Sequence, residues 1–277
     1  MKIKPIFILT ILTLLVCSLA LASCSPSREK TAEETFNDAI DAYMARKFNK
    51  AKILLDSVIY NFPDNKKIVK ESRDMLTIIY KTEQERNLIF LDSLLQVREQ
   101  ELKPLRDLFE AEDPLAENSV LIHKKQSASR AWDRSYLRAH VDKNGTFYIS
   151  SHYTGNGYIS HYAVKAVVNN SFQITDSIND DAYCHRFDDG ENYWETIKFK
   201  NNSDNGLATF IATNFDKPVD VIFIGPRTNY KIRMTETDRF AFRDTYQLAM
   251  MLREIVQIKS QIRNVRTTMK KKFSDAN

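Results

Sequence analysis

The placement of glycine constrains this chain more than any other feature of its sequence. All six glycines lie between residues 145 and 225, and the long segments before and after that interval hold none. Glycine weakens a helix interior by about 1 kcal/mol relative to alanine, and it readily forms the turns that join strands. The pattern predicts an α+β chain in which helical segments flank a central β domain.

The central segment, residues 128–234, carries the short alternating runs and turn signals that are typical of antiparallel strands. The clearest turn is Asp142–Gly145, because Asn-Gly is the strongest short hairpin signal. About seven strands at such intervals favour a sandwich or a barrel. We expect the strands at residues 137–141, 146–149, 158–168, 171–178, 193–200, 207–212 and 219–224.

Two apolar patterns with alternating spacings of three and four residues flank this domain, one in a helix expected over residues 65–112 and one in a C-terminal helix over residues 235–277. Pro104 should kink or restart the first helix. Such spacing is typical of a coiled coil, and the patterns have equal lengths. We therefore expect an antiparallel coiled-coil stalk within one chain, with a linker at residues 113–127 before the inserted β sandwich or barrel. Pairing of the C-terminal helix between two chains is the alternative. The patterns are Leu88, Leu91, Leu95, Arg98, Leu102, Leu105 and Phe109, and Leu248, Met251, Ile255, Ile258, Ile262, Val265 and Met269.

The first 23 residues have the features of a secretory leader. Lys2 and Lys4 precede an apolar run from Ile6 to Leu21. This run has about 16 residues, whereas a helix that spans a membrane needs about 20. We therefore favour a cleaved leader over a membrane-spanning anchor.

The end of this leader, Leu21–Cys24, resembles the lipobox of bacterial lipoproteins. The resemblance implies cleavage before Cys24, a diacylglycerol thioether on its sulfur and an acylated N-terminus, so that lipid anchors the chain through a tether at residues 24–31. Ser25 stands where an aspartate often marks inner-membrane retention in such lipoproteins. The acidic run that marks surface export in some of them is also missing. The resemblance therefore implies the outer membrane and a periplasmic face.

Residues 32–64 resemble one tetratricopeptide repeat. Thr31 and Glu34 match a helix capping box. Lys47 replaces the usual turn glycine, and the turn is one residue short. The segment Tyr60–Asp64 is similar to tetratricopeptide lipoproteins of the outer-membrane β-barrel assembly machinery. The residues that carry the repeat pattern are Phe36, Ala39, Tyr43, Phe48, Ala51, Leu55, Val58 and Pro63, and the resemblance implies a protein-binding surface that includes Phe36, Tyr43 and Phe48.

The sequence carries none of the usual signatures of an enzyme or a metal protein. His152 and His161 can face each other across a hairpin, but we favour ordinary strand positions for both. Cys17 leaves with the leader and Cys24 takes lipid, so Cys184 is the one remaining thiol and no internal disulfide is expected. We expect a non-enzymatic protein with no catalytic residues, no cofactor and no metal.

Charge and aromatic content set the remaining expectations. The chain has 40 Lys and Arg against 36 Asp and Glu, so nothing favours a nucleic-acid partner. We expect a lipid-anchored scaffold of the cell envelope that binds or assembles other proteins. The alternative is a glycan-binding or peptide-binding lipoprotein whose β domain uses Tyr153, Tyr158 and Trp194.

Overall fold

The computed structural model describes residues 30–115, 119–127, 133–179 and 183–273. The leader, Cys24 and nearly all of the tether that the sequence predicts lie outside these ranges. The chain divides into two compact units, Met1–Glu85 and Arg86–Asn277, which we call the helical unit and the β unit. Within the described ranges, no helix combines the length and the hydropathy needed to cross a membrane.

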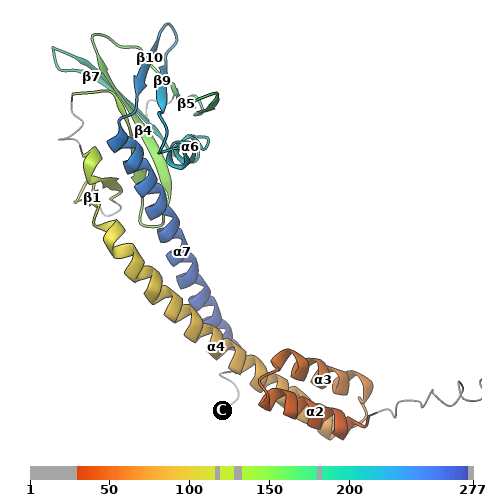
Figure 1. Cartoon of the computed structure of the whole chain (residues 1–277). Helices are drawn as coiled ribbons and strands as arrows, with labels where there is room; N and C mark the ends of the chain where they lie inside the picture. Colours follow the sequence, from red (N-terminus) through yellow and green to blue (C-terminus); the bar gives the residue numbers. More distant parts are fainter. Residues whose placement is uncertain (1–29, 116–118, 128–132, 180–182, 274–277) are drawn as a thin grey trace, which may run out of the picture. The chain divides into compact units, whose positions relative to one another are not determined.

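The helical unit consists of α2 (Ala32–Met44), α3 (Phe48–Asn61) and the N-terminal part of α4 (Lys66–Arg106) (Figure 1). The predicted capping box forms at the start of α2. The Glu34 N–H donates to Thr31 Oγ1 at 3.2 Å, and the Thr31 N–H donates to Glu34 Oε2 at 2.9 Å. The box thereby pairs two backbone N–H groups at the start of α2.

The turn between α2 and α3 has its left-handed residue at Arg46, whose φ is 57°. Lys47, where we expected a residue in place of glycine, has a φ of −89° instead. A left-handed conformation costs a residue other than glycine about 1–2 kcal/mol. The turn position whose conformation would suit a glycine is therefore Arg46, one residue before the Lys47 position at which we expected it.

The helical unit is held together by two small clusters of buried apolar side chains. One cluster draws on all three helices and is rich in alanine, which lets helices approach closely. Fully burying a leucine or isoleucine contributes about 1.5–3 kcal/mol, so cores of this size give modest stability. The two clusters are Ala39, Ala42, Ala51, Leu55 and Ile79, and Ala32, Val58 and Ile68.

Helix α4 ends at Arg106, two residues after Pro104. Proline lacks the N–H that a helix needs and its ring crowds the preceding turn, so the helix stops there rather than restarting. The chain then enters strand β1 (Phe109–Ala111). The prediction of a helix as far as residue 112 is therefore wrong at its C-terminal end. Phe109 is the first residue of β1, and its side chain shares a buried cluster with Leu248.

Two antiparallel sheets form the centre of the β unit (Figure 1). The strand orders are β1-β2-β3-β4-β8-β7 and β10-β9-β5-β6. Both sheets are open in the described part of the chain, so the barrel that we considered beside the sandwich does not form. The remaining strands are β2 (Leu121–His123), β3 (Tyr136–Val141), β4 (Phe147–Gly155), β5 (Ala163–Val168), β6 (Ser171–Ile174), β7 (Cys184–Asp188), β8 (Tyr193–Phe199), β9 (Asp220–Ile224) and β10 (Asn229–Arg233).

The main core of the β unit joins the two sheets. Leu137 and Ile149 of the six-stranded sheet share one buried cluster with Val164 and Phe223 of the four-stranded sheet. Helices α6 (Leu207–Thr213) and α7 (Glu236–Phe273) add side chains to the same cluster. All six residues of β3 are buried, so both faces of the sheet are covered at that strand.

One segment that we expected as a strand, residues 207–212, is helix α6. Leu207, Ala208, Ile211 and Ala212 are buried, and this spacing fits one face of a helix. Asp204 Oδ2 accepts the Ala208 N–H at 3.2 Å and so supports the first turn. A short apolar run fits either element. Strands β1, β2, β7 and β10 were not predicted, and β2 occupies part of the expected linker.

Helix α7 packs against α4 within the β unit, and the two helices run in opposite directions (Figure 1). Lys259 Nζ lies 2.7 Å from a carboxylate oxygen of Glu99, and Arg266 lies 3.4 Å from Asp92. The later residue of α4, Glu99, thus contacts the earlier residue of α7, Lys259, as expected for antiparallel helices. The seam residues Leu91, Ile258 and Ile262 are buried together between them.

Arg98 interrupts the apolar pattern of α4, and the structure shows how its charge is accommodated. Its Nε donates to Glu254 of α7 at 2.9 Å, and its Nη1 donates to Glu101 at 2.7 Å. Both carboxylates are partly exposed, so solvent screens these ion pairs. Arg98 therefore interrupts the apolar pattern of α4 but still contacts α7 through Glu254.

Candidate functional site

The aromatic residues that we expected to bind a protein help to build the core of the helical unit. Phe36, Tyr43 and Phe48 are half-buried and pack against its larger cluster. The ring centroids of Tyr43 and Phe48 lie 5.7 Å apart. The large apolar side chains that do face outward from this unit are Met44, Ile53, Tyr60, Ile78 and Tyr80.

The three aromatic residues that we expected on one ligand-binding face do not share a surface. Tyr153 is 5% exposed and belongs to the main core. Trp194 projects from the opposite face of the same sheet and stacks on Phe187, with ring centroids 5.9 Å apart. Tyr158 is 42% exposed and contacts Tyr193 edge-on. No continuous aromatic strip therefore joins these three residues.

Two adjacent serines on β4, Ser150 and Ser151, organise the polar interior of the β unit. Both are fully buried, and successive residues of a strand point to opposite faces of the sheet. Each hydroxyl lies 2.7 Å from an imidazole nitrogen on its own face, Ser150 from His140 and Ser151 from His161. The strand thus carries two separate serine–histidine networks.

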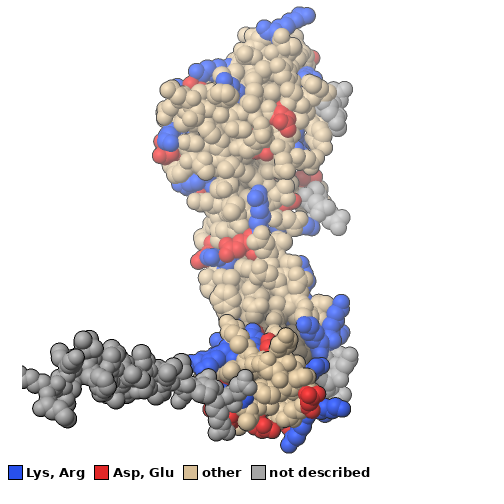
Figure 2. Space-filling view, turned by 90° about the vertical axis from the view of Figure 1, so that its right-hand side faces the viewer, with Lys and Arg blue, Asp and Glu red and all other residues tan. Residues whose placement is uncertain are grey.

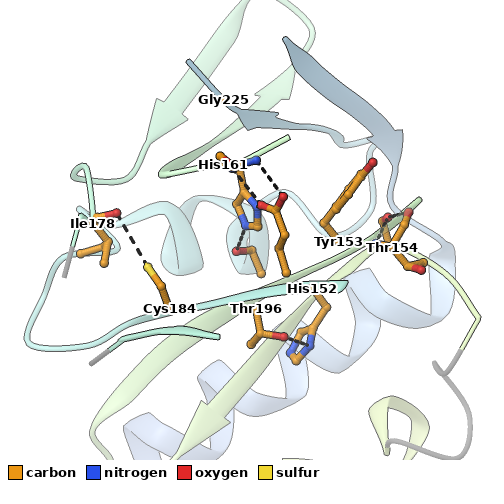
Figure 3. Close-up of polar contacts among 12 residues, drawn as sticks. His152, Tyr153, Thr154, His161, Ile178, Cys184, Thr196 and Gly225 are labelled. Atoms are coloured by element: carbon orange, nitrogen blue, oxygen red, sulfur yellow. Dashed lines mark hydrogen bonds and ion pairs between the residues drawn. The ribbon is translucent and has the colours of Figure 1, made fainter. Parts of the chain in front are cut away.

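The inner triad consists of Ser151, His161 and Glu195 (Figure 3). His161 Nδ1 lies 2.6 Å from Glu195 Oε2, and His161 Nε2 lies 2.7 Å from Ser151 Oγ. The backbone N–H groups of Ser160 and His161 donate to the same carboxylate at 2.7 and 2.9 Å. Burial raises the pKa of Glu195, but the hydrogen bonds from His161 and Ser160 outweigh it and hold that pKa below its usual value. The carboxylate only accepts, so His161 Nδ1 carries the proton that lies between them.

This order of contacts, hydroxyl to imidazole to carboxylate, is the one that serine hydrolases use to activate a nucleophile. Here Ser151 and His161 are 0% exposed and Glu195 is 1% exposed. A substrate carbonyl therefore has no path to Ser151 Oγ in this conformation. The carboxylate also holds Ser160, whose φ is 53°. The geometry fits a structural link between β4, β8 and the segment before β5.

The outer relay runs over the other face of the six-stranded sheet. Ser150 Oγ lies 2.7 Å from His140 Nε2 and 2.8 Å from His152 Nε2. His140 stacks on Tyr148 and His152 stacks on Tyr136, with each pair of ring planes within 4° of parallel. The relay ends at Thr196, 3.3 Å from His152 Nδ1 (Figure 3). Stacked rings thus shield most of its polar atoms from water.

A buried arginine borders the outer relay. Arg138 is 6% exposed, donates to the Tyr136 hydroxyl at 2.6 Å and lies 3.5 Å from Glu112. Glu112 also lies 3.5 Å from His140 Nδ1, but that contact lacks hydrogen-bond geometry. Among the described residues, His140 Nδ1 and Arg138 Nε have no hydrogen-bond partner. An unpaired buried polar atom costs about 1–3 kcal/mol, so this face keeps unused hydrogen-bonding capacity.

Other chemistry that the sequence raised has no geometric support in the described residues. No group of three or more potential metal ligands comes together there. Cys184 packs against the main core, with its Sγ 4.0 Å from the Ile178 carbonyl oxygen, whereas His185 beside it is exposed (Figure 3). His152 and His161 lie on opposite faces of the sheet and do not meet. On the face shown in Figure 2, charged side chains of the β unit stand singly or in small groups.

Sequence reasoning missed both networks around β4. The available signal was two consecutive serines between Ile149 and His152 on β4, where alternation alone predicts one buried and one exposed side chain. Glu195 lies 34 residues from His161 and gave no sign of being its partner. No protein-family model, curated protein or solved structure matches the chain. The function is therefore inferred from the contacts and from the sequence.

Acidification is expected to destabilise the β unit from about pH 6.5 downward. Burial lowers the pKa of His140 and lowers that of His152 well below its usual value, so both take up a proton less readily in the folded chain than in the unfolded one. Unfolded histidine titrates near pH 6.5, so below that pH the unfolded chain binds more protons. The free energy of unfolding is therefore not reduced by these histidines above about pH 6.5. Below that pH it falls by at most about 1.4 kcal/mol per pH unit for each histidine.

The check is the melting temperature between pH 7 and pH 5. His152→Phe keeps a ring against Tyr136 and should give a shallower pH dependence than the unmodified protein. His185→Phe, at an exposed position, should keep the original slope. Identical slopes in all three proteins would show that the buried imidazoles do not control acid stability.

Proposed function

We propose that this chain is a lipid-anchored, non-enzymatic protein of the cell envelope that binds another protein through its helical unit. The observation that carries the proposal is the outward position of large apolar side chains on that unit. Ile53 and Tyr60 are 69% and 85% exposed and lie seven residues apart on α3, hence on one helix face. Exposed apolar surface of this kind often marks a site of protein interaction.

The anchor is supported by the sequence alone. The leader and the lipobox-like segment Leu21–Cys24 support lipid on Cys24, and Ser25 supports the outer membrane over the inner one. A tether of about seven residues spans at most about 25 Å when fully extended. The helical unit would therefore work close to the membrane surface, on its periplasmic side.

The finer architecture belongs to the same proposal. A tetratricopeptide-like hairpin over residues 32–64 is supported by the packing of α2 on α3 through Ala39, Ala51 and Leu55. An intramolecular coiled coil is supported by the antiparallel contacts of α4 with α7. In this proposal the hairpin binds the partner, and the coiled coil ties together the two ends of the β unit.

Replacing Ile53 and Tyr60 together with lysine is expected to abolish cross-linking to the partner. Both side chains lie outside the core clusters, so the helical unit should stay folded, which circular dichroism verifies. The measurement is cross-linking in intact cells with the full-length lipidated chain, followed by affinity capture and mass spectrometry. Phe172→Lys is the matched control, because Phe172 is also an exposed large apolar residue, at 57%, but lies on the β unit.

Two outcomes would contradict the proposal. One is a cross-linked partner that survives the Ile53 and Tyr60 substitutions and is lost in Phe172→Lys. The other concerns the anchor: metabolic labelling with a fatty-acid analogue should mark the unmodified chain and not Cys24→Ala. Label that persists in Cys24→Ala would remove the lipid from the proposal.

A further inference from the structure

We propose that the β unit binds a small organic anion, one that carries a carboxylate or a phosphate, in a pocket floored by Tyr148. This pocket has a volume of about 350 Å³ and lies where the turn after β3 meets the end of β8. Small-molecule sites begin at about this size. The inference does not depend on the lipid anchor or on a partner of the helical unit. The side chains used below are Lys143, Asn144, Thr146, Tyr148, Lys200 and Asn201.

Lysines outnumber carboxylates among the described residues that line the pocket. Lys143 and Lys200 line it, and Lys198 projects from the same face of β8. Asp142 is the one lining carboxylate in the described residues, and its Oδ1 already accepts the backbone N–H groups of Asn144 and Thr146 at 2.8 and 2.7 Å. An anion that enters would therefore meet the ammonium group of Lys200 rather than an unsatisfied carboxylate.

Lys200 is positioned by the register of the sheet. Ile149 pairs with Phe199, which places Tyr148 and Lys200 across from each other on the outer face. The ammonium group lies 5.2 Å from the centroid of the Tyr148 ring. No carboxylate of the described residues lies within ion-pair distance of this ammonium group. The ring thus orients a cation whose charge is available to a ligand.

The Tyr148 hydroxyl supplies a second unused polar group. Tyr148 is 7% exposed, its ring stacks on His140, and its hydroxyl makes no hydrogen bond to any part of the chain that the structure describes. Burial raises the pKa of Tyr148 far above its usual value, with the charges of Glu112 and Asp142 adding to the effect. The hydroxyl therefore keeps its proton and can donate it to a ligand oxygen.

The wall of the pocket is held in place before any ligand arrives. The turn Asp142–Gly145 packs against α7, where Arg253 Nε donates to the Gly145 carbonyl at 2.7 Å. Asn144 and Asn201 also line the pocket, and an asparagine side chain carries an N–H₂ group that can donate to an anion. A site whose donors are fixed in advance loses less entropy when it binds. The charge, the unused hydroxyl and the fixed wall together favour an anion over a neutral or cationic ligand.

Three sugars that differ at one carbon provide the test: glucose, glucuronate and glucose 6-phosphate. We expect glucuronate, glucose 6-phosphate or both to bind the unmodified protein, and glucose not to bind, in calorimetry and in amide chemical shifts of the pocket residues. A carboxylate-selective site favours glucuronate, and a phosphate-selective site favours glucose 6-phosphate. Binding of glucose as tight as that of the anions, or binding of none of the three, would overturn the proposal.

Matched variants locate the site. Lys200→Gln should weaken anion binding by about tenfold, a typical effect of losing one charge-assisted hydrogen bond. Tyr148→Phe keeps the stacked ring and removes only the hydroxyl, so it gives a second, independent loss if Lys200→Gln fails to fold. Lys165→Gln is the control, because Lys165 Nζ lies 3.9 Å from the Phe172 ring centroid in the same kind of contact on the other sheet. Equal losses in the control and in the pocket variants would also overturn the proposal.

Discussion

Replacing Glu195 with glutamine is expected to destabilise the β unit by about 3–5 kcal/mol, the usual range for breaking a buried charged contact. Three donors converge on its two carboxylate oxygens: His161 Nδ1–H and the backbone N–H groups of Ser160 and His161. Glutamine offers one acceptor oxygen and places an N–H₂ group where a second acceptor is needed. At least one buried donor then loses its partner, and at 1% exposure the side chain is shielded from bulk solvent.

The measurement is the free energy of unfolding from urea titration, followed by circular dichroism. Glu191→Gln makes the same chemical change at an exposed position and should leave stability within about 0.5 kcal/mol of the unmodified protein. A loss below about 1 kcal/mol for Glu195→Gln would show that the triad is not a structural link. Reaction of Ser151 with a fluorophosphonate would contradict the same interpretation, since that reagent needs an accessible, activated hydroxyl.

Replacing Gly145 with alanine is expected to cost about 2–5 kcal/mol, for two separate reasons. The residue has a φ of 81°, which costs alanine about 1–2 kcal/mol. A Cβ at this position would also lie 2.4 Å from the Ala249 carbonyl oxygen and 2.9 Å from the Arg253 backbone nitrogen. These are backbone atoms of α7, so relief requires the turn and the helix to separate, and overpacking of this kind costs about 1–3 kcal/mol.

Gly190 separates the two causes. Its φ is 88°, close to that of Gly145, but a Cβ there would meet nothing within 4 Å. Gly190→Ala should therefore show the backbone cost alone, about 1–2 kcal/mol. Chemical denaturation of both variants gives the difference, which measures the contact of the turn with α7. Equal losses at the two positions would mean that α7 does not press on the turn in solution.

Local signals in the sequence predicted a large part of the fold. The absence of glycine outside residues 145–225 marked the helical flanks, and the pair Thr31 and Glu34 marked the start of α2. Asn144 and Gly145 placed the β3–β4 hairpin. The capping box and the turn each involve only a few neighbouring residues, so they can be recognised without knowing the tertiary structure. The strand predicted at residues 207–212 is wrong because a short apolar run is compatible with either a strand or a helix.

The networks around β4 could not be predicted in the same way. Ser151, His161 and Glu195 come from β4, from the segment before β5 and from β8, and only the register of β4 with β8 brings them together. The pocket floored by Tyr148 depends on the same register. In the same way, the positions of Tyr153 and Trp194 on opposite faces follow from strand alternation once the strand bounds are known. The residue types suggested one aromatic surface, but the alternation of side chains along the strands places Tyr153 and Trp194 on opposite faces of the sheet.

The contact of α4 with α7 also bears on how the β unit folds. Arg266 and Asp92 are 174 residues apart in the chain, and the sheets lie between them in sequence. Closing so long a loop is slow, because its entropy is lost before the contact rewards it. While the chain is being synthesised, the apolar seam of α4 therefore has no partner until α7 has been made. We therefore expect the docking of α7 to be a late step in folding, and until it docks the apolar seam of α4 is a surface that a chaperone would recognise.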